Sequence, residues 1–187
     1  MADREPASAH PMLEDASTPA ADWLEDASTP TDWLTARSIV EQTRATYWLA
    51  TVRRDGSPHV MPILAVWVDG RLFFCTGGGT LKARNLAREP RCVITVEQEP
   101  LDLVVEGVAE ITRDAATLQR VAEAYASVYD WHVTVRGGAL EGEGAPTAGP
   151  SPRDVYELAP TTAFGLPLDG TITPTRWAFH RRDPRPG

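Results

Sequence analysis

The sequence is poor in cysteine, histidine and lysine, and these shortages exclude several kinds of site. Its 187 residues include two cysteines, Cys75 and Cys92, whose spacing fits neither a CxxC motif nor a set of metal ligands. We interpret both as small buried side chains of a protein in a reducing compartment. The four histidines lie far apart, at positions 10, 59, 132 and 180. No metal site is therefore predicted.

Long hydrophobic runs and an excess of positive charge are also missing. No apolar stretch approaches the roughly eighteen residues that a membrane-spanning helix needs, and the N-terminus is acidic, unlike that of a signal peptide. The formal net charge of −8 and the pI of about 5.0 argue against a general nucleic-acid surface. We expect a cytoplasmic protein that binds neither a membrane nor a nucleic acid.

Composition divides the chain into a leader, one domain and a tail. Residues 1–30 are rich in acidic residues and proline, and the heptapeptide LEDASTP occurs there twice, so we expect a disordered acidic leader with a tandem repeat. Residues 31–180 are long enough for one domain. Within it, residues 137–152 hold five glycines and three prolines without apolar periodicity, which predicts a mobile surface loop. Residues 181–187 form a polar tail.

The apolar pattern and the turn signals predict a mostly β domain with flanking helices. Helices are expected over about 32–44, 81–89 and 114–129, with Thr31 or Asp32 capping the first and Asp114 the last. Strand-like runs occur at 46–52, 58–68, 72–75, 92–96, 101–112, 155–158, 162–168 and 175–179. Pro62 cannot donate to a ladder, so its strand is expected at an edge or with a bulge. Six or seven antiparallel strands joined by hairpins indicate a barrel or a sandwich.

One stretch carries most of the functional signal. Cys75 ends a short apolar run, three glycines follow at 77–79, and a helical pattern then begins with Lys82, the only lysine in the chain. Glycines let the backbone approach a ligand closely, and the start of a helix presents unpaired N–H groups and partial positive charge. The pattern predicts a phosphate-binding loop. The alternative is a flexible strand-to-helix connection with solvated charges.

Other polar side chains have simpler interpretations. His59 is a candidate proton donor, or else a surface histidine beside a turn. Arg53, Arg54 and Arg71 flank turns and are most simply solvated. No Ser-His-Asp order and no pair of carboxylates competes for a catalytic role, so the sequence leaves the catalytic residue unknown.

Motifs over about 45–179 are similar to those of a known family. They are WLATV at 48–52 with DGSPHV at 55–60, KARNL at 82–86 with EPR at 89–91, EGVAE at 106–110, AFG at 163–165 and PTRW at 174–177. Together they resemble the pyridoxamine 5′-phosphate oxidase-like split β-barrels, in the flavin/deazaflavin oxidoreductase branch. The resemblance implies a homodimeric antiparallel split β-barrel that binds a flavin-type cofactor between its two barrels.

The resemblance also implies a set of cofactor-binding residues by motif position. They are Lys82 for the cofactor phosphate, Thr76, Gly77 and Thr80 for loop contacts, Val60, Met61 and Pro62 along the ring system, and Arg84, Asn85 and Trp177 nearby. On a helix, Lys82 and Asn85 share a side, whereas Arg84 is turned from Lys82 by about 200°. We therefore expect Arg84 to point elsewhere.

The motifs lead to three hypotheses about function. The leading one is a reductase that uses the reduced deazaflavin coenzyme F420 to transfer a hydride to an activated double bond of a small organic substrate. The second places FMN in the same site, as an FMN-dependent oxidase or reductase. The third is a carrier that binds a flavin, a deazaflavin or haem without chemistry. The C-terminus lacks the basic ending of true pyridoxamine 5′-phosphate oxidases, so that activity itself is not predicted.

Overall fold

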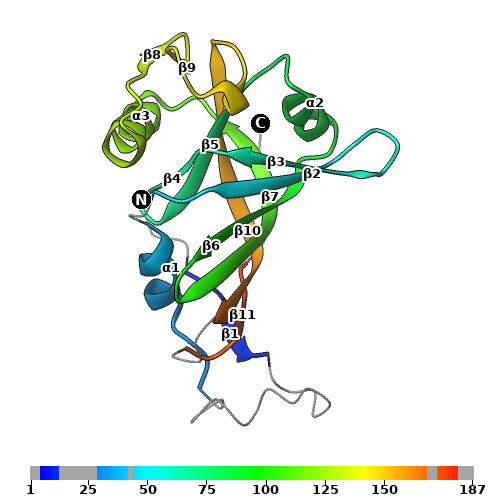
Figure 1. Ribbon diagram of the computed structural model, residues 1–187. Coiled ribbons are helices and arrows are strands. Elements are labelled where there is room, and N and C mark those ends of the chain that lie inside the picture. Colours follow the sequence, from blue (N-terminus) through cyan, green and yellow to red (C-terminus); the bar gives the residue numbers. More distant parts are fainter. Residues whose placement is uncertain (1–4, 13–28, 42–43, 168–171, 181–187) are drawn as a thin grey trace.

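The computed structural model describes residues 5–12, 29–41, 44–167 and 172–180, which form an antiparallel β structure with helices around it (Figure 1). The strands are β1 (Ser8–Pro11), β2 (Tyr47–Val52), β3 (Pro58–Ile63), β4 (Ala65–Val68), β5 (Arg71–Gly77), β6 (Arg91–Gln98), β7 (Leu101–Thr112), β8 (Thr134–Arg136), β9 (Ala139–Glu141), β10 (Arg153–Pro167) and β11 (Thr175–Ala178). The helices are α1 (Trp33–Glu41), α2 (Leu81–Arg88), α3 (Ala115–Tyr129) and the short 3₁₀ turn η2 (Pro146–Ala148). The predicted mostly β, antiparallel class is confirmed.

The strand β10 holds the sheet together. It spans 15 residues and pairs with β7 along one edge. Along its other edge it pairs first with β5 and then with β11. The order across the sheet is β1-β11-β10-β7-β6-β2-β3, and β4 continues the arrangement by pairing with β5. The strands thus curve around one interior, as the predicted barrel requires.

The sheet opens between β3 and the end of β5. The chain runs from β3 through Leu64 into β4, but its partner changes there, because β3 pairs with β2 whereas β4 pairs with β5. The β4–β5 pairing ends at Phe74, so residues 75–77 pair on one side only, with β10. Among the described strands, β2 is the one partner of β3. This opening is bordered by η2, which contacts both β3 and β5.

Two apolar clusters fill the structure. The larger lies inside the sheet, where Trp33 of α1 packs edge-on against Trp177 and Phe179 with ring centroids 5.3 and 5.1 Å apart. The smaller lies under α3 and includes Tyr125 and Trp131. The predicted caps are confirmed at both ends of this framework, because Asp32 accepts the Thr35 N–H and Asp114 accepts the Thr117 N–H.

The number of strands differs from the prediction of six or seven, since the described residues form eleven. The stretch 58–68 makes two strands because the chain changes partner at Leu64. The runs at 155–158 and 162–168 belong to one strand, β10, which continues through a register shift between Pro160 and Thr162. The edge position predicted from Pro62 is confirmed, since β3 ends the order of the sheet.

Two predicted boundaries are also corrected. Ser8–Pro11 belong to the leader expected to be disordered, yet they form β1 and pair with β11, because backbone pairing at a free edge demands little of the sequence. The predicted loop 137–152 contains β9 and η2, which contacts from other elements fix in place. Most of the tandem repeat and the tail 181–187 lie outside the described residues.

Both cysteines are buried and free, as predicted. Burial raises the pKa of Cys75 to about 11 and that of Cys92 to about 12. Across the part of the chain that the structure describes, no helix is long and apolar enough to cross a membrane. The same residues contain no group of three side chains suited to hold a metal ion.

Candidate functional site

The turn before α2 joins the end of β5 to a helix that is capped by a side chain. Thr80 has an extended backbone, and its Oγ1 accepts the Ala83 N–H at 3.2 Å, which caps the helix. The Thr80 N–H donates to the Gly77 carbonyl at 3.0 Å and closes the turn. A Cβ at Gly77 would lie 2.4 Å from the carbonyl oxygen of Pro150. Gly77 is therefore required by a close approach of the chain to itself.

Polar side chains converge beside this turn, and we call Thr76, Gly77, Thr80 and Lys82 the cradle. The Oγ1 atoms of Thr76 and Thr80 are 2.8 Å apart. Lys82 is only 5% exposed, and burial lowers its pKa because the ammonium group loses water. A cation, two hydroxyl groups and a helix start are donors that suit a phosphate. The chemistry of the cradle therefore fits the phosphate of a cofactor.

Carbonyl groups of η2 take up these donors. Lys82 Nζ donates to the Thr147 carbonyl at 2.5 Å, and Thr76 Oγ1 donates to the Ala148 carbonyl at 3.2 Å. The backbone of η2 and a phosphate are therefore alternative partners of the same donors. A phosphate matches the cradle in chemistry, but in this structure the carbonyls of η2 occupy two of its donors.

The other two motif residues of α2 divide as helical geometry predicts. Asn85 is buried with Lys82, and its Nδ2 donates to Thr51 Oγ1 at 3.0 Å, which fastens α2 to β2. Arg84 is exposed, and its Nη1 donates to the Gly79 carbonyl at 2.8 Å. The structure thus brings Lys82 and Asn85 to one side of the helix and places Arg84 outside.

His59 lies on β3, directly across from Thr51 of β2. Its Nδ1 is 3.5 Å from Thr51 Oγ1. Burial, followed by the positive charges of Arg53 and Lys82, lowers the pKa of His59. The imidazole is therefore neutral at pH 7 and a poor proton donor.

The residues predicted to lie along the cofactor ring alternate across β3. Because neighbouring strand residues face opposite sides, Val60 and Pro62 share one face and Met61 lies on the other. Val60 is 51% exposed and Met61 36% exposed. A planar group that contacts all three must lie along the free edge of β3, which η2 borders.

An arginine-rich groove of about 580 Å³ lies beside α2. Its lining is Arg53, Arg54, Asp55, Leu81, Arg84, Asn85 and Arg88. Arg53 Nη1 donates to the Pro58 carbonyl at 3.0 Å, and Arg88 Nη2 donates to the Val52 carbonyl, so the guanidinium groups also hold the hairpin against the helix. With four arginines and one acidic residue, the groove attracts anions. In the sequence, the signal for this groove is the Arg53-Arg54 pair before the Asp55-Gly56 turn. From the sequence alone, we interpret these two arginines as solvated.

Two further residues have structural positions that correct their predicted roles. Trp177 is fully buried in the larger apolar cluster, and its Nε1 donates to the Thr31 carbonyl at 3.0 Å, so it does not line the cradle. Arg71 is 4% exposed rather than solvated, and it pairs with Glu157 at 3.1 Å. Each lies on a strand that is paired on both sides, Trp177 on β11 between β1 and β10 and Arg71 on β5 between β4 and β10.

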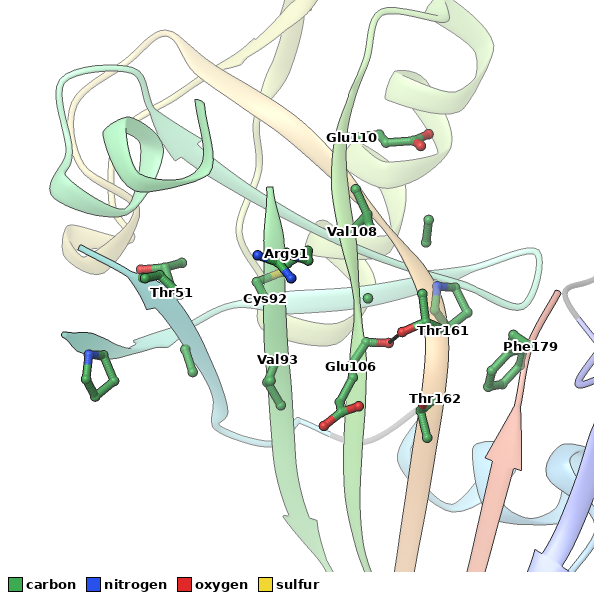
Figure 2. A pocket seen from close by; sticks show the side chains of 16 residues that line it. Thr51, Arg91, Cys92, Val93, Glu106, Val108, Glu110, Thr161, Thr162 and Phe179 are labelled. Carbon is green, nitrogen blue, oxygen red and sulfur yellow. Dashed lines mark hydrogen bonds between the residues drawn. The ribbon is translucent and has the colours of Figure 1, made fainter. Parts of the chain in front are cut away.

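A hollow of about 890 Å³ extends across β2, β6, β7 and β10 (Figure 2). Figure 2 shows Arg91 and Val93 on one strand beside Glu106 and Val108 on the next, with Phe179 at the far end. None of the cradle residues lines this hollow. The sequence does not reveal it, because its lining comes from segments that are far apart along the chain.

The sequence matches one family model over residues 36–166, and that model is described as pyridoxamine 5′-phosphate oxidase. This match covers more than two thirds of the chain, since 131 of 187 residues lie within it. No curated protein matches the sequence.

Solved structures of this fold come from several bacteria. A conserved hypothetical protein of Mycobacterium tuberculosis is similar at 23% identity and a TM-score of 0.59, over 79% of this chain and 91% of that one. A heme-binding protein of Mycobacterium smegmatis has 22% identity and a TM-score of 0.52, over 74% and 55%. An FMN-binding protein of Nostoc punctiforme PCC 73102, described as related to pyridoxamine 5′-phosphate oxidase, has 23% identity and a TM-score of 0.50, over 79% and 85%. At these identities the likeness establishes the fold alone.

Proposed function

The chain belongs to the pyridoxamine 5′-phosphate oxidase family, and from that premise we propose that it is a cofactor-dependent oxidoreductase whose cofactor phosphate binds in the cradle. One observation carries the proposal. The single lysine of the chain is almost completely buried at the start of a helix, beside two hydroxyl groups, and no acidic side chain is among its hydrogen-bond partners in the described residues. Burying an ammonium group is costly unless a strong acceptor compensates for it. A phosphate is such an acceptor.

We propose reduced F420 as the cofactor and a small organic molecule with an activated double bond as the hydride acceptor. The arginine-rich groove supports this choice, because F420 carries an acidic tail as well as a phosphate, and the groove is lined by Leu81, Arg84 and other residues of α2, the helix that carries Lys82. The FMN alternative uses the same cradle and leaves the groove without a role.

When bound, such a cofactor supplies the hydride chemistry, and the protein supplies placement and electrostatics. Lys82, Thr76 and Thr80 hold the phosphate. The free edge of β3 offers backbone groups and the side chain of Met61 to the ring. The lowered pKa of His59 favours the neutral imidazole, so we assign this residue no proton-donating role.

The test is a titration of the purified full chain with F420, FMN and haem, read by fluorescence or absorbance. The proposal expects F420 to bind more tightly than FMN, because only F420 fills both the cradle and the groove. Tighter binding of FMN favours the alternative cofactor. Binding of haem without either of the others favours the carrier, and binding of none of the three rejects the proposed function.

A further inference from the structure

The cradle is covered by a segment of the same chain, residues 142–151, which we call the strap. It includes η2 and extends from the end of β9 to the start of β10. We propose that the strap is an intramolecular ligand of the cradle, and that a phosphate-bearing ligand binds only by displacing it. The proposal rests on the proposed function for the identity of that ligand, but the displacement itself concerns the chain alone.

The strap lies in direct contact with the cradle. Its Thr147 and Ala148 carbonyls accept from Lys82 and Thr76, as a phosphate oxygen would. A Cβ at Gly149 would lie 2.4 Å from Thr80 Cγ2, so strap and cradle approach each other too closely for a side chain there. The strap is therefore seated on the cradle rather than suspended over it.

A single buried arginine, Arg153, holds the strap through contacts that are separate from the cradle. Arg153, the first residue of β10, is 4% exposed and uses its guanidinium group almost entirely on strap atoms. Its partners are the carbonyls of Gly149 at 2.9 Å, Gly142 at 2.7 Å and Gly144 at 3.1 Å, and the hydroxyl of Ser151 at 3.0 Å. Such a planar fork of donors gathers several carbonyls at once.

Trp131 completes this fastening. The guanidinium carbon of Arg153 lies 5.2 Å from the centre of the Trp131 ring, and Trp131 Nε1 donates to the Glu143 carbonyl at 2.6 Å. The strap is thus held mainly by side chains that bind its carbonyls. Within the strap, the Ala148 N–H donates to the Ala145 carbonyl at 2.8 Å, which closes the 3₁₀ turn.

Because the strap offers only neutral carbonyls to Lys82, a negatively charged ligand should displace it and an uncharged one should not. The Lys82 ammonium now binds a neutral carbonyl, and exchange for a phosphate gives the same cation an acceptor of opposite charge, which adds Coulomb attraction to the hydrogen bond. An uncharged ligand gains nothing of the kind and leaves the strap in place. Because η2 also contacts β3, the same movement uncovers the strand edge along which a ring would lie. One displacement therefore opens both halves of the cofactor site.

The test measures amide hydrogen exchange of strap peptides in the full chain, alone and with F420, FMN or inorganic pyrophosphate. Each ligand that enters the cradle is expected to speed exchange at the Ala148 N–H. The variant Trp131→Phe keeps the ring but loses the bond to Glu143, and it should bind these ligands about two to ten times more tightly, since the closed state loses one hydrogen bond. Arg153→Gln should act in the same direction more strongly, provided that its circular dichroism stays native.

Arg113→Gln is the matched control. Arg113 Nη1 donates to the Gly138 carbonyl at 2.8 Å and pairs with Asp154 at 2.7 Å, so this variant also loses an arginine–carbonyl bond, together with one ion pair, but outside the strap. Its affinities should equal those of the wild type. The inference is wrong if ligands bind while amide exchange in the strap is unchanged or slower, and if Trp131→Phe binds them no more tightly than the wild type. The strap would then be a fixed part of the site.

The pyrophosphate arm separates this inference from the proposed function. If neither F420 nor FMN binds any variant while pyrophosphate still speeds strap exchange, displacement stands and the oxidoreductase proposal falls. If no ligand changes strap exchange in wild type, Trp131→Phe or Arg153→Gln, displacement is rejected as well.

Discussion

At the scale of single residues, the burial of the Lys82 ammonium group is only partly compensated by its hydrogen bond. Its burial lowers its pKa, so the folded state holds the ammonium group at a cost in free energy that the Thr147 carbonyl offsets only in part. A buried cation whose acceptors are neutral gains free energy when an anion binds beside it. The proposed function and the displacement of the strap both depend on this gain.

We expect Lys82→Met to weaken binding of FMN or F420 by about 1.5–3 kcal/mol, the range for a hydrogen bond to a charged group. Methionine keeps the length of the side chain and removes its charge, so the fold should persist. For FMN, Arg84→Met is the matched control on the same helix, since Arg84 is exposed and outside the cradle. The dissociation constants come from fluorescence titration.

The control also discriminates between the cofactors. Because Arg84 lines the arginine-rich groove, Arg84→Met should weaken F420 and leave FMN nearly unchanged. Equal dissociation constants for Lys82→Met and the wild type would mean that the lysine is a structural charge.

At the scale of elements, local signals in the sequence locate the helices well. Asp32, Thr80 and Asp114 cap the three α-helices within a few residues of the predicted starts, because capping depends on neighbours along the chain. The strap is different. Its contacts join residues near 147 to residues near 80, and no periodicity marks a segment whose role is to present carbonyls to a distant lysine.

Asp114 provides a test of helix capping as a function of pH. Hydrogen bonds from the Thr117 side chain and backbone lower the pKa of Asp114. Its contribution to stability is therefore present above the unfolded-state pKa, near 3.9, and is lost as the pH falls through the lower folded-state value. We expect Asp114→Ala to lower the Tm by a few degrees at pH 7, and by less at a pH below that window.

Asp114→Asn is the informative comparison, because asparagine also caps helices but carries no charge. Its Tm at pH 7 should lie between those of the wild type and Asp114→Ala, and its difference from Asp114→Ala should not change with pH. A pH-independent gap between wild type and Asp114→Ala would contradict the assignment of this carboxylate as the cap.

The strand β1 has a stabilising role that is separate from the site. Figure 1 places β1 and β11 at the opposite end of the molecule from α2. Deleting residues 1–12 should therefore leave cofactor affinity unchanged and reduce the free energy of unfolding by on the order of 1 kcal/mol, since it exposes the edge of β11. Denaturant unfolding measures the loss, and a large fall in affinity would show that the leader reaches the site.

At the scale of the whole molecule, we expect a homodimer. Apolar side chains remain exposed on the outward face of the β2–β3 hairpin, where Trp48 is 46% and Val60 51% accessible. The large hollow extends from this hairpin across the neighbouring strands. These features match a surface that a second copy covers.

A charge on that face should separate the subunits. We expect Val60→Glu to raise the dimer dissociation constant about tenfold or more, because it buries an unpaired carboxylate at the interface. Gln119→Glu, on the exposed side of α3, adds the same charge elsewhere and should leave the constant unchanged. Sedimentation velocity over a concentration series measures both, and a monomeric wild type would contradict the expectation.

The architecture of the whole chain was largely predictable, whereas the environment of single aromatic and basic residues was not. Hairpin spacing predicted a barrel or a sandwich, Pro62 predicted an edge or a bulge, and the split barrel itself came from the resemblance to a known family. Arg71 was wrongly predicted to be solvated, and Trp177 was left open between two roles, because a tryptophan in a core and one beside a cofactor have the same sequence surroundings. Only the long-range pairing of β10 with β5, β7 and β11 buries them.

The scarcity of lysine has a practical consequence. Apart from the α-amino group at the N-terminus, the Lys82 side chain is the one primary amine in the sequence, and it sits behind the strap. An amine-selective acylating reagent would therefore modify this protein at a site whose reactivity rises and falls with the opening of the cradle. A mass spectrometer could follow that opening over time without any engineered label.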